Sequence, residues 1–98
     1  MQLNEIVDQI FDIATATEYN NISYSHPLLV STGKKPHPSD LLTSIAAPLK
    51  LKITNSTPIS KTEISAALED LKKVDKKYKI KELKELIKDL KIYLDSLG

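Results

Sequence analysis

The chain contains no cysteine and no arginine, and only two glycines among its 98 residues. The absence of cysteine excludes disulfides, thiolate metal ligands and cysteine nucleophiles. The absence of arginine removes the side chain best suited to bidentate recognition of phosphate, carboxylate and guanine. We therefore expect neither a disulfide-stapled fold nor a protein that reads a DNA sequence.

Long apolar runs are absent as well. No stretch approaches the ~20 consecutive apolar residues that a membrane span requires. The first residues include Glu5, Asp8 and Asp12, whereas a secretory signal begins with basic residues. With 41% hydrophobic residues, a chain of this length fits one small core. The sequence predicts a single domain over residues 1–98, cytoplasmic and without a membrane span.

Charge is divided unevenly along the chain. Residues 1–48 carry two lysines and five acidic residues, whereas residues 49–98 carry twelve lysines and eight acidic residues. The simplest interpretation of the basic half is a solvated helix surface, because acidic residues are interspersed among the lysines. The alternative is non-specific contact with the phosphates of a nucleic acid. The candidate residues for polyanion contact are Lys72, Lys73, Lys76, Lys77, Lys84 and Lys88.

The strongest periodic pattern lies at the end of the chain, where large apolar residues recur at steps of three and four from residue 80 onward. This spacing predicts an amphipathic helix with a wide apolar stripe, about 27 Å long over residues 80–97. One short partner helix does not cover so much apolar surface. The residues predicted to bind a protein partner or a second copy are Ile80, Leu83, Leu86, Ile87, Leu90, Tyr93, Leu94 and Leu97.

Two further helix starts are predicted from capping patterns. Asn4 precedes an apolar stripe that continues to about Tyr19, and we expect it to be the N-cap of the first helix. Ser60 and Glu63 form a capping box, which predicts a helix from residue 61. The sequence leaves open whether residues 60–97 form one helix or two; in the second case Asp75 would cap the last helix.

The middle of the chain predicts a β element. A short helix should open at Pro38 and stop before Pro48, because the residue before a proline is disfavoured in a helix. Residues 49–54 then alternate between apolar and lysine or threonine side chains, which is the pattern of a half-buried strand. Its expected partner is an extended run within residues 22–31. The predicted fold is therefore helix-dominated α+β, with about four helices and a two-stranded β element. The alternative is an all-α four-helix bundle.

No pattern indicates catalysis or metal binding. His26 and His37, even with Asp40, match no usual spacing of metal ligands. No nucleophile stands at a recognisable spacing from a base. We expect no catalytic residue, no metal, no cofactor and no enzymatic activity. A small ligand-binding protein or enzyme centred on the loop of His26 and His37 remains the second alternative.

These observations predict a function that depends on a surface. The first expectation is a non-enzymatic protein–protein interaction module, or a small accessory protein, that binds through its C-terminal amphipathic helix. A nucleic-acid-associated protein that uses the face from Lys72 to Lys91 is the alternative.

Overall fold

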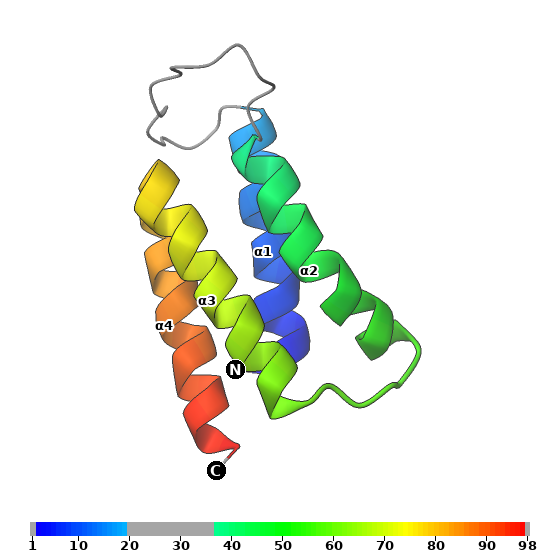
Figure 1. Cartoon of the computed structure of the whole chain (residues 1–98). Coiled ribbons are helices and arrows are strands. Elements are labelled where there is room, and N and C mark those ends of the chain that lie inside the picture. The colour runs from blue at the N-terminus through cyan, green and yellow to red at the C-terminus, as the bar shows by residue number, and fades with distance from the viewer. Residues whose placement is uncertain (1, 20–36, 98) are drawn as a thin grey trace.

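The computed structural model describes residues 2–19 and 37–97. This part of the chain forms four helices and no strand: α1 (Leu3–Glu18), α2 (Pro38–Thr54), α3 (Lys61–Tyr78) and α4 (Lys81–Ser96). Successive helices run in opposite directions (Figure 1), and the packed pairs are α1 with α2, α2 with α3, α3 with α4 and α4 with α1. The all-α four-helix bundle is therefore the correct alternative, and the prediction of an α+β fold is wrong.

The predicted strand over residues 49–54 is instead the last part of α2, which continues through Pro48. The apolar residues of α2 that face the core recur at helical spacing: Leu42, Ala46, Leu49 and Ile53. Leu51, which completes the apparent alternation, is 62% exposed. A proline weakens or bends a helix but does not end it where packing holds both sides. The expected partner strand within residues 22–31 lies outside the described residues.

Two lysines at the end of α2 also explain the misleading alternation. The Nζ of Lys50 donates hydrogen bonds to Asn4 Oδ1 and Asp8 Oδ1 of α1, both at 2.9 Å. The Nζ of Lys52 donates to the carboxylate of Glu63 in α3 at 2.5 Å. Residues two positions apart on a helix point about 200° apart, so these lysines reach opposite neighbours. The alternation of apolar residues and lysines thus occurs in a helix whose lysines contact a different neighbouring helix on each side.

The start of α1 differs slightly from the prediction. The N-cap position is held by Gln2, which makes no capping hydrogen bond with its side chain. Asn4, the predicted N-cap, lies inside the helix, where its amide oxygen accepts from Lys50. The start of α1 is therefore fixed by packing against α2 rather than by a local cap.

The capping box predicted at the start of α3 is confirmed. The N–H of Glu63 donates to Ser60 Oγ at 3.1 Å, and the N–H of Ser60 donates to Glu63 Oε1 at 3.4 Å. The hydrogen bond from Lys52, followed by that from the Ser60 N–H, lowers the pKa of Glu63 below its usual 4.5. One carboxylate thus caps α3 and connects it to α2.

Residues 60–97 form two helices, and the break comes after Tyr78. Lys79 adopts a left-handed conformation with φ of 53°, and its N–H donates to the carbonyl oxygen of Asp75 at 2.6 Å. Ile80, not Asp75, is the N-cap of α4, so the predicted cap is wrong. Asp75 belongs to α3, and its Oδ1 is buried without a hydrogen-bond partner. The turn therefore depends on a lysine in a conformation that favours glycine.

All four helices contribute to one core. Its largest fully buried side chains include Ile6 and Ile10 of α1, Leu42 of α2, Ile64 and Leu71 of α3, and Leu83, Leu86 and Leu90 of α4. Tyr78 and Ile80 close the core at the turn between α3 and α4 and are also fully buried. None of the described helices has the length and apolar character needed to cross a membrane.

Candidate functional site

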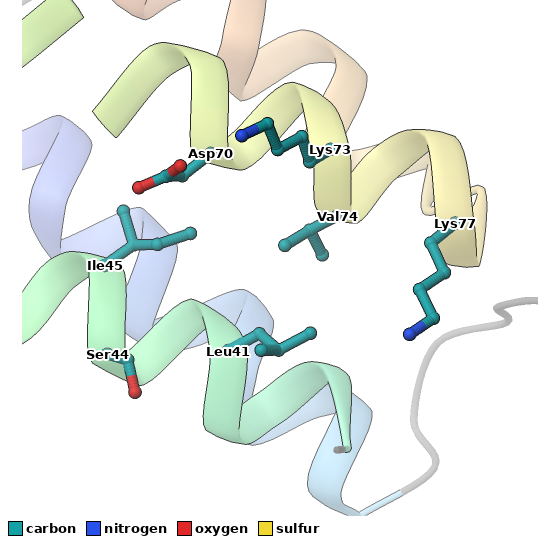
Figure 2. Close-up of a pocket in the computed structure, with 7 residues that line it drawn as sticks. All are labelled: Leu41, Ser44, Ile45, Asp70, Lys73, Val74 and Lys77. Atoms are coloured by element: carbon teal, nitrogen blue, oxygen red, sulfur yellow. The ribbon is translucent and has the colours of Figure 1, made fainter. Parts of the chain in front are cut away.

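A groove runs between α2 and α3 on the outside of the bundle, and we call it the α2/α3 groove. Its larger part has a volume of about 350 Å³ and is lined by Leu41, Ser44 and Ile45 of α2 and by Asp70, Lys73, Val74 and Lys77 of α3 (Figure 2). A second hollow of about 240 Å³ adjoins it and shares Ser44, Ile45 and Asp70. This second hollow extends the groove toward Pro48 and Glu63.

The floor of the α2/α3 groove is apolar. Leu41 and Ile45 are half-buried, and Val74 opposite them is buried. Figure 2 shows these three side chains facing one another between the two helices. They come together because Leu41 and Ile45 each precede a core residue of α2, so they lie about 100° around the helix from the core.

Small side chains keep the groove open. Ala66 and Ala67 of α3 and Ser44 of α2 line it where larger side chains would fill the space. Pro48 lies on the same side of α2. Because Pro48 has no N–H, the carbonyl of Ser44 lacks its usual intrahelical hydrogen bond. The contact between α2 and α3 is less extensive than that between α1 and α2.

The rim of the α2/α3 groove is charged, and its charges all come from α3. Asp70 lies near the middle, whereas Lys73 and Lys77 lie toward the end of the helix. Neither of these lysines forms an ion pair with a carboxylate of the described residues. The Nζ of Lys77 lies 5.6 Å from the centre of the Tyr78 ring, a favourable cation–π distance.

The apolar stripe predicted to bind a partner is divided by the structure. Four of its members are buried in the core of the single chain: Ile80, Leu83, Leu86 and Leu90. Ile87, Tyr93 and Leu94 are half-buried against that core, and Leu97 is 46% exposed. A partner that meets the folded chain therefore reaches Leu97, and reaches Ile87, Tyr93 and Leu94 only in part.

The six lysines predicted for polyanion contact are all exposed, but they do not share one face. Lys73 and Lys77 border the α2/α3 groove. Lys72 is turned about 100° from Lys73 on the same helix, and its Nζ lies 3.5 Å from the Glu69 carboxylate. Lys76 follows Lys72 by four residues and shares its side of α3. Lys84 and Lys88 belong to α4.

His37 has a local structural role. Its Nδ1 accepts the N–H of Ser39 at 3.1 Å and lies 2.8 Å from Ser39 Oγ, so the ring caps the start of α2. His26 lies outside the described residues. Within residues 2–19 and 37–97, no three histidine, aspartate or glutamate side chains are grouped so as to hold a metal ion.

The sequence did not predict the α2/α3 groove, because an apolar pattern on one helix does not show how closely the neighbouring helix covers it. One signal was present in the sequence. Leu41, Leu42, Ile45 and Ala46 form two adjacent pairs, which give a helix a wider apolar arc than one core contact needs. An apolar arc of that width on α2 indicates a second surface beside the core.

Comparison of the chain with known protein families, with curated protein sequences and with solved structures finds no match.

Proposed function

We propose that the protein is a non-enzymatic protein-binding module that receives its partner in the α2/α3 groove. The observation that carries the proposal is the apolar floor of Leu41, Ile45 and Val74, which lies open beside a complete core. Apolar grooves of this kind receive the apolar side of a partner helix in many complexes. Its charged rim supports the same function, because protein interfaces combine an apolar centre with a polar edge.

The exposed end of the α4 stripe is a second candidate surface for the same function. Leu97 is exposed and Leu94 is half-buried, and the hollow beside Leu94 is bordered mainly by polar side chains of α3. Leu94 is the only large aliphatic side chain that lines this hollow, whereas Leu41, Ile45 and Val74 line the α2/α3 groove. We therefore expect it to contribute less to binding.

Affinity capture with matched variants tests the proposal. The tagged protein is incubated with lysate of its own source, and each sample is divided into nuclease-treated and untreated halves. Leu41→Lys changes the groove, Leu97→Lys changes the end of α4, and Leu51→Lys is the control on an exposed part of α2. Circular dichroism confirms that each variant is folded. Lysine is suitable because its alkyl stem lies along apolar surface while its charge reaches water.

We expect a stoichiometric protein partner to survive nuclease treatment with the wild type and Leu51→Lys, and to be lost with Leu41→Lys. Loss with Leu97→Lys alone would move the binding site to α4. Retention of nucleic acid, without any nuclease-resistant partner, would overturn the proposal and favour the exposed lysines as a polyanion-binding surface.

A further inference from the structure

The α2/α3 groove has a shape that fits a single helix. It is a concave channel whose lining along α3 extends from Glu63 to Lys77. Fifteen residues of helix span about 21 Å between the first and the last Cα atom, so a partner helix of about four turns matches its length. Two copies of the chain placed groove to groove would leave a void between two concave surfaces, and a void sacrifices contacts. A convex occupant fills the groove better than a second copy does.

The charged side chains of the groove change from acidic to basic along α3. Toward the start of α3, Glu63 is already paired with Lys52, and Asp70 follows near the middle. Toward the end of α3, Lys73 and Lys77 lie on the rim without a carboxylate partner among the described residues. The groove is therefore basic at one end only.

The acidic residues near the basic end of the groove, Asp40 and Asp70, do not form ion pairs with its lysines. Asp40, in the first turn of α2, is exposed and does not line the groove. As an acidic residue in the first turn of α2, it interacts favourably with the positive end of the helix dipole. Asp70 precedes Lys73 by three residues but forms no ion pair with it. No carboxylate of residues 2–19 and 37–97 therefore competes with an incoming chain for an ion pair with Lys73 or Lys77.

We infer that the partner segment is an amphipathic helix of about fourteen residues whose carboxylates lie at one end, beside Lys73 and Lys77. This inference rests on the proposed function of the α2/α3 groove. The apolar side of the segment presents aliphatic side chains at positions i, i+3 and i+7 to Leu41, Ile45 and Val74, as in other helix-in-groove complexes. The lysines set its direction and accelerate its association, since charge complementarity at a rim acts mainly on orientation and rate.

Two synthetic peptides test the inference. Both are fourteen residues long, carry leucine at positions 2, 5, 9 and 12, and are held helical by a staple on the polar side. One carries glutamates in its C-terminal half, and the other carries lysines at the same positions. The complete 98-residue chain is titrated with each peptide at low and high salt, and binding is mapped by NMR chemical shifts.

We expect the glutamate peptide to bind at least tenfold more tightly than the lysine peptide at low salt. The largest shift changes should occur at Leu41, Ile45 and Val74, and the difference between the peptides should shrink at high salt. The double variant Lys73→Glu/Lys77→Glu should reverse the preference. The matched charge reversal Lys84→Glu/Lys88→Glu on α4 should leave it unchanged.

Failure of the inference is distinguishable from failure of the proposed function. Equal affinity for both peptides, unaffected by Lys73→Glu/Lys77→Glu, would overturn the acidic character of the partner helix. Binding of neither peptide would overturn the helical partner. In both cases, loss of a captured protein with Leu41→Lys would still support the groove as the binding site.

Discussion

The two sides of α2 pack very differently. Against α1, α2 buries Leu42 and Ala46 completely, and Lys50 crosses to Asn4 and Asp8. Against α3, α2 leaves Leu41 and Ile45 half-buried in a groove, and the polar contact of Lys52 with Glu63 lies near one end. Residues that are adjacent in the sequence of α2 thus pack in the core on one side of the helix and line an open groove on the other.

This difference separates stability from binding within a single helix. Leu42 touches the core and is shielded from water, so its methyl groups stabilise the fold. Leu41 stays accessible and contributes less to folding, but it is positioned to contact a partner. The following predictions test whether the two sides of α2 are as distinct as their packing indicates.

The largest effect is expected from truncation on the closed side. Leu42→Ala should lower the free energy of unfolding by about 2–5 kcal/mol, because it leaves a cavity in the core. Leu41→Ala should lower it by about 1 kcal/mol or less, since that side chain is only half-buried. Urea unfolding followed by circular dichroism measures both. Equal losses would mean that the groove is part of the core.

Replacing the proline within α2 should have the opposite sign. Pro48→Ala restores a backbone N–H that can donate to the Ser44 carbonyl, and alanine is the best helix former. We expect the free energy of unfolding to rise by up to about 3 kcal/mol in the same urea experiment. A loss of stability would contradict the view that Pro48 weakens a continuous α2.

The start of α3 depends on its capping box. Ser60→Ala should lower the free energy of unfolding by about 1 kcal/mol, because the N–H of Glu63 loses its acceptor. Ser65→Ala, in an exposed position within α3, is the control and should be neutral or slightly stabilising. Thermal unfolding distinguishes the two variants. A similar loss in both would show that the cap does not anchor this side of the groove.

A substitution at the end of α3 should raise the free energy of unfolding by a smaller amount. Lys79→Gly should raise the free energy of unfolding by about 0.5–1 kcal/mol, because glycine adopts the left-handed conformation at little cost. Lys81→Gly, two residues later in the first turn of α4, should instead reduce stability. The opposite signs of these two substitutions test the position of the turn in one denaturation series.

The smallest effect is a dependence on pH. In the folded chain the pKa of Glu63 lies below 4.5, mainly because of the hydrogen bond from Lys52. Its contribution to stability is therefore complete above pH 4.5 and is lost as the pH falls through the lowered value. The difference in stability between the wild type and Glu63→Gln should shrink on acidification. A difference that grows toward low pH would contradict this sign.

The sequence predicted the helices where a local signal and a tertiary contact agree. The capping box at Ser60 and the periodicity of the last helix are of this kind. The prediction failed after Pro48, because alternating leucine and lysine suits both a strand and a helix with neighbours on two sides. The helical spacing of Leu42, Ala46, Leu49 and Ile53 is also present in the sequence, but it runs across Pro48, where the prediction ended the helix.

The candidate site was less predictable than the fold. An apolar stripe in a sequence does not say which of its members the core will cover. In the C-terminal stripe, Leu86 and Leu90 are buried, whereas Leu41 and Ile45 of α2 line an open groove. The division depends on how closely each pair of helices approaches, and that distance is set by the whole bundle.

Accessibility of the methyl groups of α2 to a soluble paramagnetic probe tests the central claim most directly. Strong broadening of the Leu41 and Ile45 methyl signals, together with protection of those of Leu42 and Ala46, is the result expected if α2 has one side in the core and one side in an open groove. Equal protection of all four would contradict that account, because the groove would then be closed in solution.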